Sequence, residues 1–200
     1  MLTLEEVILQ AKLQVLFKGG HGSGDHGHAG RPGERGGSSG GSSFDATTRE
    51  ERAALQSYSG TGYMGINLSL RGQGGLKLTD KQADQVKLID AAMGRHVLDK
   101  SMTVFRGIDE PFAKKLAAGT RFKDKAFVST TADKPRARSW AGAGRGAIMQ
   151  ITVPKGASAI FMDHNLSDNW SEHEWLLDRN TTFHVTSVQR GVVYAKVTHG

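Results

Sequence analysis

The feature that most constrains this chain is a change of hydrophobic period near residue 94. Before this point the sequence predicts three helices, over residues 46–57, 63–71 and 79–93. After it come seven short β-like runs, at residues 103–108, 126–131, 147–153, 157–162, 174–177, 182–188 and 192–197. Short helices are expected among them at residues 110–118 and from Asp133 onward. Helices first and strands later indicate an α+β fold with a mixed, mostly antiparallel sheet.

Two segments of different character precede this domain. Residues 1–18 have helix-forming composition and a wide apolar stripe, which predicts a helix that docks on a partner chain or on the domain itself. Residues 19–43 contain eleven glycines and few apolar side chains, which predicts a flexible linker. The domain then spans residues 44–200, enough to bury a hydrophobic core.

The net charge and the composition limit the kinds of ligand and partner that the domain is expected to bind. The formal net charge is +6, and residues 44–200 carry all of it, with 22 basic and 16 acidic side chains. A basic domain favours an anionic ligand or partner. No apolar run approaches the roughly 20 residues of a membrane span, and the N-terminus lacks the pattern of a signal peptide, so we expect a protein without membrane contact. The chain has no cysteine and its linker histidines are isolated, so we predict no metal site.

Two carboxylates, Glu172 and Glu174, stand one residue apart at the start of an apolar run. If the run is a strand from Glu172 onward, both side chains project from one face, roughly 6.5–7 Å apart, and His173 points the other way. Such a pair suits work on one small polar substrate. The alternative is a solvated edge strand that carries two surface glutamates.

Two further motifs lie upstream of the acidic pair. Arg106 sits inside a strand-like segment and precedes Gly107, so its charge must face a carboxylate, solvent or an anionic ligand. Ser129, Thr130 and Thr131 close a hydrophobic run and place hydroxyl groups at a strand end. The alternatives are an ion pair within the fold for Arg106, and helix capping for the hydroxyl triplet.

The order of these motifs resembles that of mono-ADP-ribosyltransferases of the arginine–serine–glutamate class, particularly the actin-modifying bacterial toxins and their phage-encoded relatives. The resemblance covers residues 44–198, and its helical lead-in is carried by Tyr58, Gly60, Tyr63, Ile66, Asn67, Leu70 and Arg71. It extends to the helix at 79–93 and to the Val153–Gly156 step. It implies N-terminal helices followed by a β-sandwich around a cleft for NAD, the co-substrate.

The resemblance also implies a role for each motif. Arg106, with Gly107 beside it, would hold the NAD phosphates. Ser129 and Thr130 would support the nicotinamide-side ribose and the catalytic glutamate. Glu174 would bind the ribose hydroxyl and stabilise positive charge as the nicotinamide bond breaks.

The resemblance implies that the polar loop before the strand at 174–177 recognises the protein that accepts the ADP-ribose. In this class a glutamate at the position of Glu172 goes with arginine acceptors, so Glu172 would orient or deprotonate an arginine of a host protein. Trp170, together with Asn169, would form the lip that recognises that protein. Trp140 is interpreted as core rather than as a contact to NAD.

The sequence therefore predicts an NAD-dependent mono-ADP-ribosyltransferase. Residues 27–33 look like a segment of phage head-associated proteins, which suggests a phage head or portal partner for residues 1–43 and a place in the virion or the host cytoplasm. Secretion as a toxin is the alternative setting. Alternative functions are an NAD glycohydrolase, a non-enzymatic phage structural protein and a glycosidase, the last of which leaves Arg106 and Ser129 without a purpose.

Overall fold

The computed structural model describes residues 46–141, 145–162, 166 and 173–198. The predicted docking helix at 1–18 and the linker at 19–43 lie outside these residues. Within the described ranges, no helix is long and apolar enough to cross a membrane.

The helical layer is built from three α-helices that follow one another along the chain: α2 (Arg49–Ser57), α3 (Tyr63–Leu70) and α4 (Asp80–Arg95). Capping boxes fix the starts of α2 and α4, through Thr48 with Glu51 and Thr79 with Gln82. The first α-helix ends at Ser57, as the sequence predicts. A π-helical turn, η1 (Tyr58–Gly62), with a kink at Gly60, leads directly into α3.

The strands form one mixed sheet of order β2-β7-β8-β4-β1-β3-β6-β5, in which only the β4–β8 pair is parallel among the described strands. The strands are β1 (Met102–Ile108), β2 (Arg121–Asp124), β3 (Val128–Thr131), β4 (Ala147–Val153), β5 (Ala159–Phe161), β6 (Glu174–Leu177), β7 (Thr181–Gln189) and β8 (Val192–Thr198). The predicted α+β class and mostly antiparallel sheet are confirmed.

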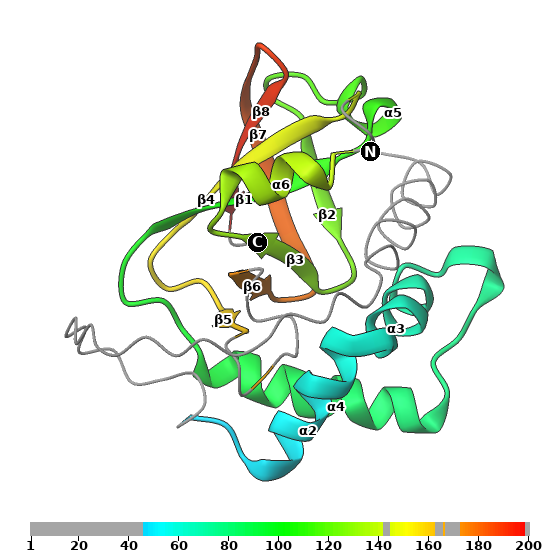
Figure 1. Ribbon diagram of the computed structural model, residues 1–200. Coiled ribbons are helices and arrows are strands. Elements are labelled where there is room, and N and C mark those ends of the chain that lie inside the picture. Colours follow the sequence, from blue (N-terminus) through cyan, green and yellow to red (C-terminus); the bar gives the residue numbers. More distant parts are fainter. Residues whose placement is uncertain (1–45, 142–144, 163–165, 167–172, 199–200) are drawn as a thin grey trace, which may run out of the picture.

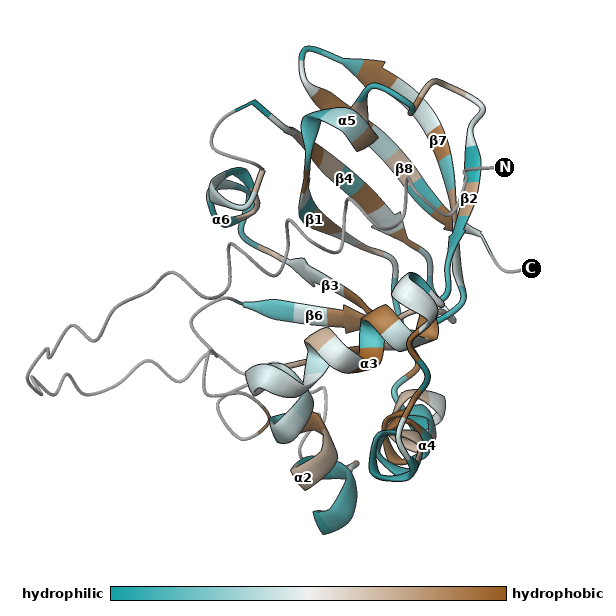
Figure 2. Ribbon diagram, turned by 90° about the vertical axis from the view of Figure 1, so that its right-hand side faces the viewer, coloured by the Kyte–Doolittle hydropathy of each residue, from teal (hydrophilic) through white to brown (hydrophobic). Residues whose placement is uncertain are grey.

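The sheet is nearly divided between β1 and β3, because a single residue pair, Phe105 with Thr131, joins them. A first hydrophobic core lies between the two parts: it combines Val104 and Met149 of the larger part with Val128 and Leu177 of the smaller one. A second core packs the other face of β3, β6 and β5 against α2, α3 and α4. Figures 1 and 2 show the resulting layers, with the three helices beyond β3 and β6 and away from β4, β7 and β8.

Two short helices interrupt the strands. The helix α5 (Glu110–Ala113) is capped by Asp109, whose carboxylate accepts a hydrogen bond from the backbone N–H of Phe112, and it is shorter than the predicted 110–118. The helix α6 (Lys134–Ser139) is capped by Asp133, as the sequence predicts, and packs on β1. Strand β2 was not predicted from the sequence; it forms by pairing with β7.

Candidate active site

Arg106 lies on β1, where strand alternation places it on the same face as Val104 and Ile108 of the first core. Its side chain is only 3% exposed. One guanidinium nitrogen, Nη1, lies 3.4 Å from the carbonyl oxygen of Ser129, while Nε has no hydrogen-bond partner among the described residues. Burial lowers the pKa of Arg106 to about 10. A buried arginine with donor capacity left over suits an anionic ligand.

Ser129 and Glu174 lie on the neighbouring strands β3 and β6, where Ser129 pairs with Leu176 and Thr131 pairs with Glu174. This register puts Ser129 and Glu174 on one face, the face of the second core. The Ser129 hydroxyl donates a hydrogen bond to Oε1 of Glu174, a carboxylate that is only 2% exposed. Ser129 therefore contacts Arg106 through its backbone and Glu174 through its side chain.

Gly107 and Thr130, which the resemblance places at NAD, have clear packing roles. A Cβ at Gly107 would lie 2.5 Å from the carbonyl oxygen of Ala137 and 2.6 Å from the carbonyl carbon of Trp140, so α6 approaches β1 only because residue 107 is glycine. Thr130 is fully buried and donates a hydrogen bond of 2.7 Å to the carbonyl oxygen of Trp175. Trp140 itself is half-buried at the end of α6.

The backbone at His173 changes the interpretation of the acidic pair. Strand β6 begins at Glu174, and His173 is exposed with a left-handed φ of 47°. The strand alternation on which the prediction for Glu172 depends therefore begins only at Glu174. Glu172 lies outside the described residues, as do Asn169 and Trp170.

Sequence reasoning did not assign a role to a group of polar side chains from the helical layer. The Asn67 amide donates to the Tyr58 hydroxyl at 2.9 Å and lies 3.5 Å from the carbonyl oxygen of Phe127, two residues before Ser129. Arg71 forms an ion pair with Asp124. The spacing of Tyr58, Asn67 and Arg71 was part of the resemblance and could have pointed to them, whereas Asp124 carries no sequence signal beyond its charge.

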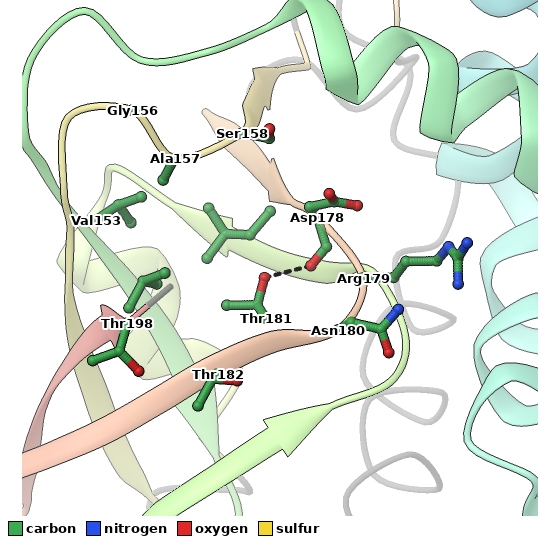
Figure 3. Close-up of a pocket in the computed structure, with 12 residues that line it drawn as sticks. Val153, Gly156, Ala157, Ser158, Asp178, Arg179, Asn180, Thr181, Thr182 and Thr198 are labelled. Carbon is green, nitrogen blue, oxygen red and sulfur yellow. Dashed lines mark hydrogen bonds between the residues drawn. The ribbon is translucent and has the colours of Figure 1, made fainter. Parts of the chain in front are cut away.

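A separate pocket of about 200 Å³ lies where the β4–β5 and β6–β7 turns meet the end of β8 (Figure 3). Its lining includes Asp178, Asn180 and Thr182, and none of Arg106, Ser129 and Glu174. Burial raises the pKa of Asp178. Arg179 points away from the pocket toward α4, where it pairs with Asp90 at 2.7 and 2.8 Å. No three histidine, cysteine, aspartate or glutamate side chains cluster as metal ligands in the described part of the chain.

Solved structures of similar fold are bacterial ADP-ribosyltransferases. The toxin Plx2a of Paenibacillus larvae has a TM-score of 0.64 and 22% identity, covering 78% of this chain and 90% of its own. C3stau2 of S. aureus, solved with NAD, has a TM-score of 0.64 and 21% identity, with coverages of 76% and 88%. The enzymatic component C2-I of the Clostridium botulinum C2 toxin has a TM-score of 0.65 and 20% identity, covering 78% of this chain and 44% of its own.

Sequence comparison gives the family directly. A search of curated protein sequences finds no significant match. The profile of the ADP-ribosyltransferase exoenzymes matches residues 38–198, which is most of the chain and includes Arg106, Ser129 and Glu174. NAD is the co-substrate of these enzymes. The chain belongs to the ADP-ribosyltransferase exoenzyme family.

Proposed function

We propose that this protein is a mono-ADP-ribosyltransferase that transfers ADP-ribose to an arginine side chain of a target protein. NAD supplies the ADP-ribosyl group and releases nicotinamide. The observation that carries the proposal is the placement of Ser129 between Arg106 and Glu174. It brings a buried cation and a buried carboxylate to either side of one residue, as a dinucleotide with an anionic diphosphate and a reacting ribose requires.

Arg106 binds the diphosphate in this proposal. Its guanidinium is buried, and its weak contact at 3.4 Å to Ser129 leaves hydrogen-bonding capacity for phosphate oxygens. An anion at this position also offsets the cost of burying the charge, the same cost that lowers the pKa of Arg106. Gly107 and Thr130 contribute by holding β1 against α6 and β3 against β6.

Glu174 accepts a hydrogen bond from the ribose hydroxyl and stabilises the positive charge that develops as the nicotinamide bond breaks. A fixed carboxylate is most effective where water is excluded, and Glu174 is almost fully buried. The hydroxyl of Ser129 fixes one oxygen of this carboxylate, which reduces the reorganisation needed during the reaction.

Arginine specificity rests on Glu172. A guanidinium stays protonated at neutral pH and is a weak nucleophile, so a nearby carboxylate is needed to orient it or to take its proton. The sequence places Glu172 two residues before Glu174, with Asn169 and Trp170 in the same loop as candidates for target recognition. Strand β6 begins only at Glu174, after the left-handed backbone of His173.

We further propose that the enzyme acts on host proteins in a phage infection, with residues 1–43 as the tether to a head or portal protein. Support comes from the linker sequence alone. A toxin acting after secretion is the alternative that the bacterial structural neighbours favour.

The test is transfer of label from NAD into a host lysate by the wild type, Glu172→Gln and Glu174→Gln, followed by peptide mapping. We expect labelled arginine with the wild type, little label with Glu172→Gln although nicotinamide is still released, and neither product with Glu174→Gln. Free ADP-ribose without labelled protein would instead identify a glycohydrolase. A folded wild type that releases no nicotinamide would contradict an enzymatic function.

A further inference from the structure

A buried ion pair joins the helical layer to the sheet just before β3, whose Ser129 contacts Arg106 through its carbonyl oxygen. Nε and Nη2 of Arg71, which follows α3, donate to the two carboxylate oxygens of Asp124 at 2.9 and 2.8 Å. The side chains are 5% and 10% exposed, respectively. This fork-to-fork geometry fixes the plane of the guanidinium as well as its distance.

Asp124 is itself held by the sheet. It ends β2, where it pairs with Thr181 of β7. Its Oδ1 also accepts a hydrogen bond of 3.0 Å from the backbone N–H of Ala126, in the turn that leads to β3 and Ser129. The position of Arg71 is therefore set by the same turn that positions Ser129.

Arg71, Arg106 and Asp124 influence one another electrostatically. After burial, the strongest influences on the pKa of Arg106 are Asp124, which raises it, and Arg71, which lowers it, so all three side chains lie within electrostatic range of one another. Asp124 also overcomes the effect of burial on Arg71 and keeps its pKa raised. One aspartate thus serves two buried arginines, and this group of three retains an excess of positive charge.

Tyr58 connects this group to the reactive end of the site. The pKa of its hydroxyl is raised, first by burial, and Glu174 and Asp124 act in the same direction while Arg71 acts against them. The Tyr58 hydroxyl therefore lies in the fields of both carboxylates. The Tyr58 hydroxyl also accepts a hydrogen bond from the Asn67 amide, which lies 3.5 Å from the carbonyl oxygen of Phe127, between Asp124 and Ser129 in the chain.

We propose that Asp124 is a positioning residue of the NAD site, which holds Arg71 against the sheet beside Arg106 so that the two arginines form a preset cation pair for the diphosphate. This inference rests on the proposed function. Asp124 repels the diphosphate, so its contribution to binding is geometric. Without Asp124, the region would be more positive but Arg71 would no longer be fixed.

The experiment measures the dissociation constant of NAD by calorimetry, and KM and kcat for nicotinamide release, for the full chain. The variants are Asp124→Asn, Asp124→Glu and, as a matched control, Asp90→Asn in the bidentate Asp90–Arg179 pair. We expect Asp124→Asn to weaken NAD binding and raise KM at least tenfold, with kcat changed less than threefold. Asp124→Glu should give a KM between those of the wild type and Asp124→Asn, and the control should match the wild type.

Each outcome separates the possibilities. Loss of folded protein alone would lower the apparent kcat and leave KM unchanged, which would overturn the inference, as would tighter NAD binding by Asp124→Asn. If Asp124→Asn does not fold, Asp124→Glu decides: an unchanged KM refutes the positioning role and a raised KM supports it. A wild type that does not bind NAD would refute the proposed function itself.

Discussion

The Arg71–Asp124 and Arg179–Asp90 pairs share one bidentate geometry, with all four N–O distances between 2.7 and 2.9 Å. Both join the helical layer to the strands. The first is buried among other charges at the candidate active site, whereas the second is about one third exposed at the edge of the pocket in Figure 3. The same contact geometry therefore occurs in two surroundings that differ in burial and in nearby charge.

Removing one carboxylate from each pair tests this difference most strongly. Asp124→Asn leaves Arg71 buried without a counter-charge, so we expect a loss of about 3–5 kcal/mol in the free energy of unfolding. Asp90→Asn affects a pair that water screens and should cost at most about 1 kcal/mol. Urea unfolding of both variants measures the two values. Equal losses would mean that burial does not distinguish the pairs.

The carboxylates of the two regions should differ as sharply in activity. Glu174→Gln removes the fixed negative charge that stabilises the breaking nicotinamide bond, so we expect kcat for nicotinamide release to fall about 100- to 1000-fold. Asp178→Asn in the pocket is the matched control and should retain wild-type kcat. A Glu174→Gln variant with normal turnover would remove the active-site assignment.

A serine from each of the two regions, Ser129 at the candidate active site and Ser158 at the pocket, allows a comparison with a smaller expected effect on the rate. Ser129→Ala removes one hydrogen bond to a charged group, worth about 1.5–3 kcal/mol, and should slow nicotinamide release about 10- to 100-fold. Ser158→Ala, on the wall of the pocket, should have no effect on this rate. An unchanged rate of nicotinamide release for Ser129→Ala, with the fold shown intact by circular dichroism, would contradict this role of Ser129.

The smallest effect concerns Asp178 and pH. Burial raises the pKa of Asp178 in the folded protein, so folding favours the protonated carboxyl. The stability that this preference contributes is complete below the pKa of Asp178 in the unfolded chain, and it is lost as the pH rises through the pKa in the folded protein. At pH 7 the ionised carboxyl is therefore unfavourable, and Asp178→Asn should raise the free energy of unfolding by less than about 1 kcal/mol. At pH 3 the two proteins should unfold alike; a larger gain there than at pH 7 would contradict the assignment.

Much of the fold follows from local pattern. The runs at 147–153 and 174–177 are strands with the predicted bounds. Both are rich in apolar residues, which the two cores bury. The resemblance also led to Arg106, Ser129 and Glu174, and Ser129 contacts both of the others. Their roles in catalysis stay predictions.

Other features depend on tertiary context. Strand β2 contains three charged residues in four and forms because β7 offers a partner along its whole length. The left-handed backbone at His173 has only a weak local signal: histidine adopts a positive φ more often than most residues other than glycine, but still in a small minority of cases. The carboxylate of Asp124 gains its importance only from two arginines that are 53 and 18 positions away in the chain.

The π-helical turn at Tyr58–Gly62 fixes the rotational phase of the helix that follows it. Each residue of an α-helix advances the side-chain direction by about 100°. Removing one residue from this turn and restoring a regular helix would therefore swing α3 by about a quarter of a revolution relative to α2. Asn67 would then lose its hydrogen bond to Tyr58, and Arg71 would lose its ion pair with Asp124. Both contacts would be lost although none of the four residues had been substituted. The angular setting of this part of the site is thus held by the length of the turn.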